Sequence, residues 1–127
     1  MTSYIGIDYG SARVGIATGN SESKLATPLS TVAPDKVAAI VAERMPDVIV
    51  VGLPRSLDGR ETPQTLAVRR YADDVLEELG VELVFQDEAG TSGVAEDRLK
   101  ESGRKYAREA IDAEAAAIIL QDYLDLL

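Results

Sequence analysis

The sequence predicts an α/β fold in which a mixed sheet of about five strands carries helices on both faces. Short runs rich in apolar and β-branched residues alternate with longer segments whose apolar residues recur every three or four positions. The first two runs, residues 4–8 and 13–19, are separated only by the turn "YGSA" at residues 9–12, which predicts an antiparallel hairpin. The later strands alternate with helices, and such connections make the sheet mixed.

Three more strands are expected after the hairpin. The segment "LATPLSTV", residues 25–32, contains Pro28, which keeps a strand short or at the edge of a sheet. The segment "DVIVVGLP", residues 47–54, is a continuous apolar run, as expected for a strand buried on both faces. "VELVFQDE", residues 81–88, is the last strand.

The first helix is expected at residues 33–45. Pro34 suits its first turn. Its spacing predicts one apolar face made of Val37, Ile40, Val41 and Met45.

Three further helices are expected at residues 62–80, 91–103 and 108–127. Thr62 is the expected cap of the first of them, and Gly80 marks its end. The last helix is rich in alanine, which suits close packing. No repeat or linker interrupts residues 1–127, so we expect a single domain.

Histidine and cysteine are both absent from this chain of 127 residues. Their absence excludes disulfides, thiolate or histidine zinc sites, cysteine nucleophiles and Ser-His-Asp triads. If the protein is an enzyme, its chemistry must come from carboxylates, Lys, Tyr, Ser or Thr, with an oxygen-ligated metal ion as the expected helper.

The formal net charge of −9 argues against a nucleic-acid partner, because phosphate contacts need positive charge. Clustered basic residues and metal-binding acids weaken that argument, so the charge does not settle the question. The first residues lack the pattern of a signal peptide, and no apolar run approaches the ~20 residues of a membrane span. We therefore expect a cytoplasmic protein with no membrane partner.

Four acids stand where a site is expected. Asp8 ends the first strand, Asp87 and Glu88 end the last strand, and Asp112 lies on the apolar stripe of the last helix, near its start. Sites in α/β sheets form beyond the carboxyl ends of the strands, so these acids can converge. Acids from the two strands and the helix would make an oxygen cage for Mg²⁺ or Mn²⁺, and such ions promote phosphodiester hydrolysis.

Each acid also has a purely structural interpretation. Asp8 would accept hydrogen bonds from turn amides, Asp87 and Glu88 would be solvated acids at a strand end, and Asp112 would favour the start of a helix. The spacing alone does not decide between the two interpretations.

Four segments resemble the YqgF/RuvX family in order and spacing: "GIDYGSARVGIA", "VVGLPRSLDG", "DEAGTS..AEDRL" and "IDAEAAAIILQDYLD". The resemblance covers nearly the whole chain. It implies a fold similar to ribonuclease H and the Holliday-junction resolvases. It also implies a nuclease for the 5′ end of precursor 16S ribosomal RNA, with an older suggestion of Holliday-junction resolution.

The resemblance implies that Asp8, Glu88 and Asp112 are catalytic and hold the metal ion. Asp87, the neighbour of Glu88, is a candidate auxiliary ligand whose role stays open. The chain departs from the family pattern after Glu88, where Ala89-Gly90 replaces the usual Arg and Leu. If that Arg orients the Glu or grips a phosphate, the departure implies reduced or redirected activity.

Basic residues in two segments are candidates for binding substrate phosphates: Arg55 and Arg60 in one, and Arg104, Lys105 and Arg108 in the other. Residues 55–61 follow a strand and contain glycine, which lets backbone approach RNA, although an ordinary connecting loop would look the same. Residues 98–108 carry five basic residues and one acid, which indicates either a basic clamp or a solvated helix end. Tyr9, beside Asp8, is either a base-stacking or a packing residue.

The expected function is therefore metal-dependent hydrolysis of precursor 16S rRNA, with a ribosomal subunit as a further partner. The alternative is a non-catalytic RNA- or ribosome-binding assembly factor on the same fold. Holliday-junction resolution is a third interpretation, with structured DNA as the substrate, and cutting two strands symmetrically would normally require a dimer.

Overall fold

The computed structural model describes residues 1–88 and 108–127. A mixed five-stranded sheet with the strand order β3-β2-β1-β4-β5 forms its centre, and this arrangement confirms the predicted fold class. β1 pairs antiparallel with β2 and parallel with β4, β2 pairs antiparallel with β3, and β4 pairs parallel with β5. The strands are β1 Ser3–Tyr9, β2 Val14–Asn20, β3 Thr27–Val32, β4 Val48–Pro54 and β5 Glu82–Glu88.

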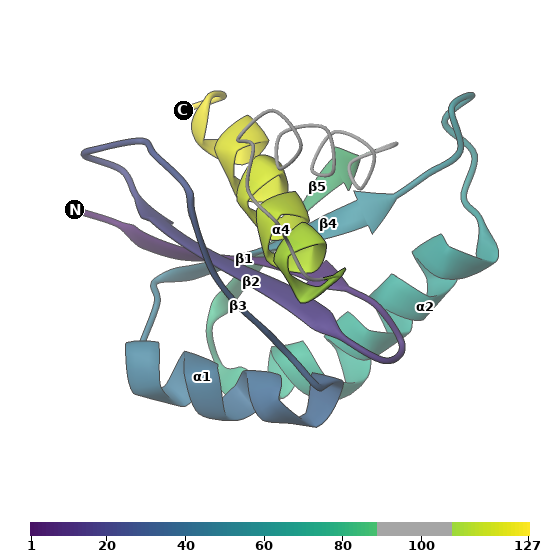
Figure 1. The fold of residues 1–127 in the computed structure, drawn as a ribbon, viewed down its shortest axis with the longest axis horizontal. Helices are drawn as coiled ribbons and strands as arrows, with labels where there is room; N and C mark the ends of the chain where they lie inside the picture. Colours follow the sequence, from purple (N-terminus) through teal and green to yellow (C-terminus); the bar gives the residue numbers. More distant parts are fainter. Residues whose placement is uncertain (89–107) are drawn as a thin grey trace.

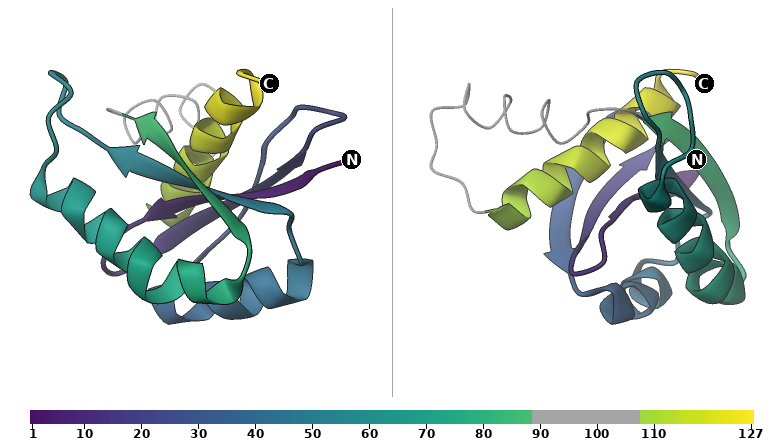
Figure 2. Two further views of the ribbon diagram at one scale, coloured as in Figure 1. Left: turned by 180° about the vertical axis from the view of Figure 1, so that it is seen from behind. Right: turned by 90° about the vertical axis from the view of Figure 1, so that its right-hand side faces the viewer.

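Helices cover both faces of the sheet. Helix α4, Arg108–Leu124, crosses one face, whereas α1, Val37–Arg44, and α2, Pro63–Tyr71, lie on the other (Figures 1 and 2). The helix predicted at residues 91–103 lies outside the described residues.

The register of the central strands decides which residues face α4. Tyr4 of β1 aligns with Val48 of β4, which aligns with Glu82 of β5. Tyr4 and Val48 are buried together with residues of α4, so the even-numbered residues of these three strands face α4. The odd-numbered residues of β1 and β4 pack in the opposite core with α1 and α2.

Helix α4 lies directly on the backbone of the sheet because glycines stand beneath it. A Cβ atom added to Gly15 in β2 would lie 1.9 Å from the carbonyl oxygen of Asp112. A Cβ atom at Gly52 in β4 would lie 2.4 Å from Cδ1 of Ile119. At Gly15 the added atom would meet backbone, which cannot give way as the end of the Ile119 side chain can, so Gly15 sets the depth at which α4 sits on the sheet.

The local signals at helix ends were mostly predictive. Pro34 begins a 3₁₀ turn, Pro34–Lys36, that leads into α1. Thr62 caps α2 in a capping box with Thr65, as its position predicted. Gly80 adopts a left-handed conformation with φ +71° at the expected helix end.

Two details of the predicted helices are wrong. Met45 does not belong to the buried face of α1, since it is 76% exposed and ends the helix in a left-handed conformation. The segment after α2 is not a regular α-helix, because it continues as a π turn, Ala72–Leu76, and a 3₁₀ turn, Glu77–Leu79.

None of the helices in the described part of the chain combines the length and the apolar character that crossing a bilayer requires.

Candidate active site

The site begins with Asp8, near the carboxyl end of β1. Asp8 pairs across the hairpin with Gly15, and the backbone of Asp112 passes over that glycine. The register points Asp8 toward α4, so its carboxylate is partly buried beside Asp112. Burial, and then the negative charge of Asp112, raises the pKa of Asp8 to about 6.

Asp112 lies in α4 and binds a cationic side chain. Nε of Arg13 donates a hydrogen bond to Oδ2 of Asp112 over 2.7 Å, and the two side chains are 37% and 23% exposed. Arg13 ends the hairpin turn, in which the amide of Gly10 donates to the carbonyl of Arg13 over 2.9 Å. The hairpin therefore supplies both the carboxylate of Asp8 and the positively charged guanidinium of Arg13 to the same site.

Glu88 shares the α4 face with Asp8 but is farther away in the sheet. It aligns with Pro54 at the end of β5, and β4 lies between β5 and β1. Two strand spacings separate β1 from β5 by about 10 Å. Within residues 1–88 and 108–127, no three His, Cys, Asp or Glu side chains are grouped closely enough to hold one metal ion.

Asp87 has the opposite orientation. Its position in β5 places it on the face of α2, and its carboxylate binds Nε of Arg55 over 3.1 Å. The structure thus brings Asp8 and Asp112 together, leaves Glu88 on the same face but two strands from β1, and turns Asp87 away from them.

The pair of Asp8 and Asp112 has the chemistry of a divalent-cation site. Both are hard oxygen ligands, which suit Mg²⁺ and Mn²⁺. Burial, and then the neighbouring negative charge of Asp112, disfavours the ionised form of Asp8 and raises its pKa. A bound cation would remove that penalty, so these two residues fit such an ion.

Arg55 holds together the ends of β4 and β5. Its amide donates to the carbonyl of Glu88 over 3.0 Å, and its guanidinium donates to Asp87 over 3.1 Å and to the carbonyl of Gly59 over 3.3 Å. A hollow lined by Arg55, Leu57 and Gly59 also includes Glu88. The Arg55 side chain therefore fixes the loop after β4 next to Glu88.

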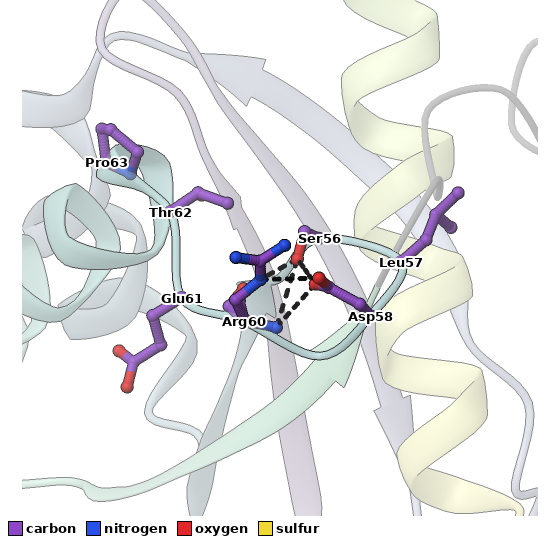
Figure 3. Close-up of a pocket in the computed structure, with 7 residues that line it drawn as sticks. All are labelled: Ser56, Leu57, Asp58, Arg60, Glu61, Thr62 and Pro63. Carbon is purple, nitrogen blue, oxygen red and sulfur yellow. Dashed lines mark hydrogen bonds and ion pairs between the residues drawn. The ribbon is translucent and has the colours of Figure 1, made fainter.

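The rest of this loop is braced by its own side chains (Figure 3). Ser56 hydrogen-bonds Asp58, and Nε of Arg60 binds Oδ2 of Asp58 over 2.6 Å. The Arg60 side chain is 84% exposed, so its charge is partly offset but remains accessible. Leu57 is 95% exposed and lies at the tip of the loop.

Of the remaining candidate residues, Tyr9 has a packing role, and the basic residues before α4 lie wholly or partly outside the described residues. The ring of Tyr9 stacks on Tyr71 with centroids 4.3 Å apart, which matches the packing interpretation of Tyr9. Arg104 and Lys105 lie outside the described residues. Arg108 begins α4, and the structure describes its backbone but not its side chain.

Arg13 belongs to the site but was not among the residues predicted from the sequence. A signal was available, because Arg13 precedes Gly15 by two positions and must share its face in an extended hairpin. Gly15 pairs with Asp8, so parity alone places a cation on the side of the sheet that carries the acid.

Comparison with solved structures first defines the class of fold. The chain superimposes on RuvC of Thermus thermophilus in complex with a Holliday junction substrate, with a TM-score of 0.59 and 18% identity, covering 98% of this chain and 94% of that one. A second structure of T. thermophilus RuvC matches with a TM-score of 0.55 and 17% identity, over 98% and 95% of the two chains. The protein therefore has the ribonuclease H-like fold of these proteins.

Residues 2–126 match the family described as "RuvX: Holliday junction resolvase", and the chain belongs to this family. A relative from Chloroflexus aggregans is 40% identical over 95% of this chain and 92% of its own length. A relative from Fusobacterium nucleatum is 37% identical over 99% of both chains. Both are named "Putative pre-16S rRNA nuclease". The predicted family is confirmed, and these names agree with the predicted class of enzyme, a hydrolase of phosphodiester bonds.

Proposed function

We propose that the protein is a cytoplasmic, divalent-metal-dependent nuclease that hydrolyses RNA, with the 5′ end of precursor 16S rRNA as its substrate. The observation that carries this proposal is that Asp112 of α4 lies beside Asp8 of β1, in a chain of the RuvX family. The names of the relatives support the choice of RNA.

Asp8 and Asp112 would hold the cation, and Glu88 would be the third acid at the same face. When bound, Mg²⁺ or Mn²⁺ would offset the negative charge of the phosphodiester and lower the pKa of a water molecule, which makes that water a better nucleophile. The protein's own part is to keep both carboxylates ionised and aligned. Because the pKa of Asp8 is about 6, its carboxylate is mostly ionised at pH 7 and becomes protonated in mild acid.

Substrate phosphates would be bound by basic residues around this face. Arg60 on the loop after β4 is the most exposed cation among the described candidates. Arg104, Lys105 and Arg108 add positive charge in the sequence immediately before Asp112. In this proposal they offset the net charge of −9 where RNA approaches.

Purified protein incubated with Mg²⁺ or Mn²⁺ and matched RNA and DNA substrates tests the proposal. We expect cleavage of RNA that carries the 5′ extension of 16S rRNA. Asp8→Asn and Asp112→Asn should each lower the rate by at least about 100-fold, since loss of even an outer partner of a metal site costs 10–100-fold. Asp74→Asn, an exposed acid after α2, is the matched control.

A non-catalytic assembly factor is the alternative, and one observation favours it. In the described parts of the chain the acids do not form a three-ligand group, and Asp112 is bound by Arg13. Such a factor would bind RNA equally well after Asp8→Asn and would cut nothing. Cleavage of four-way DNA junctions in preference to RNA would instead indicate junction resolution, the activity for which the family model is named.

A further inference from the structure

Arg13 contacts an acid that the proposed function assigns to a metal ion. The contact is short, 2.7 Å from Nε to Oδ2 of Asp112, and it joins residues 99 positions apart. It is also partly buried, whereas the pair formed by Arg60 and Asp58 has side chains that are 84% and 49% exposed. The Arg13 contact is therefore half-buried, and it engages a carboxylate of the site itself.

The charges of the site explain why a cation is needed there. Asp8 pairs across the hairpin with Gly15, and the backbone of Asp112 passes over that glycine, so the two carboxylates are neighbours. Without compensation, two neighbouring carboxylates repel each other and resist ionisation. The guanidinium at Asp112 supplies one positive charge that cannot be removed by deprotonation in the ordinary pH range.

A divalent cation would need the same carboxylate. Coordination by Oδ2 of Asp112 would bring the ion next to the guanidinium that already binds this oxygen. Two cations at one carboxylate oxygen repel each other strongly in partly buried surroundings. Coordination of the ion through Oδ2 of Asp112 therefore requires the Arg13 side chain to move.

We propose that Arg13 is a competing counter-ion that occupies Asp112 in the metal-free protein and is displaced when a divalent cation binds. This inference rests on the proposed function, because it assumes that Asp112 binds the ion. Arg13 is then a positioning residue that keeps the two acids together before loading and sets the cation concentration at which loading occurs.

Titration calorimetry with Mn²⁺ tests the competition directly, without RNA or turnover. If the ion pair competes with the ion, its removal in Arg13→Gln should tighten Mn²⁺ binding about three- to tenfold, the range expected for removing one ion pair of this kind. The free-Mn²⁺ signal in electron paramagnetic resonance provides an independent measure of the same affinity.

Arg69→Gln is a closely matched control. Nε of Arg69 binds Glu61 at the same distance, 2.7 Å, and its side chain is 38% exposed, compared with 37% for Arg13. This pair lies at α2, on the other face of the sheet, so its loss should leave Mn²⁺ binding unchanged. Arg13→Met serves if Arg13→Gln does not fold: it keeps an unbranched side chain without the positive charge, so it should also bind Mn²⁺ more tightly than the parent.

The outcomes separate this inference from the proposed function. If the parent binds Mn²⁺ and both Arg13 variants bind it equally well or more weakly, competition is wrong and Arg13 instead helps to assemble the site. If neither the parent nor the Arg13 variants bind Mn²⁺, the metal-dependent function fails, and the inference fails with it.

Discussion

Asp112 in α4 lies close enough to Asp8 in β1 for its negative charge to add to the burial that raises the pKa of Asp8 to about 6. The two residues come from opposite parts of the sequence, and only the packing of α4 on the hairpin joins them. The relationship has measurable consequences even in the absence of RNA.

The first prediction concerns folding stability in metal-free buffer. A pKa raised from 3.8 to about 6 means that the folded protein binds the Asp8 proton more tightly than the unfolded chain. The contribution of Asp8 to the free energy of unfolding should therefore fall as the pH rises from about 4 to about 6 and then level off. Since one pKa unit is about 1.4 kcal/mol, Asp8→Asn should stabilise the protein at pH 7.5 by about 1–3 kcal/mol.

Urea unfolding of parent and Asp8→Asn at several pH values, with a chelator present, measures this effect. The fall between pH 4 and 6 should be reduced in the variant. Asp74→Asn, which changes the same charge at an exposed position, should leave the pH profile of the parent intact. An Asp8→Asn protein that is less stable than the parent at pH 7.5 would contradict the prediction.

The second prediction concerns the glycine beneath α4. Gly15→Ala introduces a Cβ atom 1.9 Å from the carbonyl oxygen of Asp112, so α4 must lift from the sheet. We expect a decrease of about 3 kcal/mol in the free energy of unfolding, as for other overpacked cores, and loss of cleavage.

Gly80→Asn is the control for this substitution. Gly80 has φ +71° with no neighbour within 4 Å of an added Cβ atom, and asparagine tolerates that conformation. It should change stability little. A Gly15→Ala protein as stable as the control would show that α4 is not held at its present depth by the glycine.

The third prediction separates positioning from phosphate binding at Arg55. Because Arg55 binds Asp87 and the carbonyl of Gly59, Arg55→Ala and Asp87→Asn should reduce cleavage by similar factors. The double variant should be little worse than either single one, since both remove the same ion pair.

RNA affinity measured over a salt series provides the contrasting result. If Arg55 contacts a phosphate, Arg55→Ala should lower the slope of log affinity against log salt by roughly one, and Asp87→Asn should not. That outcome would mean that Arg55 binds a substrate phosphate, as the sequence predicted, and does not only position the loop.

The fourth prediction concerns the basic residues before α4. Replacing both Arg104 and Lys105 with alanine should weaken RNA binding across sequences, and the salt slope should fall by roughly one for each phosphate that these side chains bind. Lys36→Ala with Arg44→Ala removes the same charge at exposed positions around α1, on the face of the sheet opposite α4. This double variant should have a smaller effect on RNA binding. Equal slopes for the two double variants would mean that residues 104 and 105 do not bind the RNA backbone.

Much of the fold follows from local chemistry. The apolar run of residues 47–54 is the buried strand β4, and Pro28 lies in an edge strand, as its missing amide hydrogen requires. Met45 shows the limit of such patterns. Its spacing fits the buried stripe of α1, but a left-handed residue at a helix end no longer follows the helical period and points its side chain elsewhere.

The site was partly predictable for a similar reason. Asp112 is a polar residue on an apolar helix stripe, and Asp8 is an acid near a strand end. Both patterns predict a side chain that faces a site at the edge of the sheet, and the two residues are neighbours in the structure. The distance of Glu88 from them depends on the order of strands across the sheet, which no local pattern contains. The ion pair of Arg13 depends on the docking of α4, so it too appears only in three dimensions.

The docking of α4 onto β1 and β2 also has a consequence for biosynthesis. A ribosome makes Asp8 long before Asp112, and proteins are extended at only about 5–20 residues per second. The glycine-lined surface that receives α4 must remain uncovered during that interval, and the two acids cannot meet until the helix has emerged and packed. Under the proposed function, a nascent chain that has not yet formed α4 therefore cannot cut RNA, including that of the ribosome that is making it.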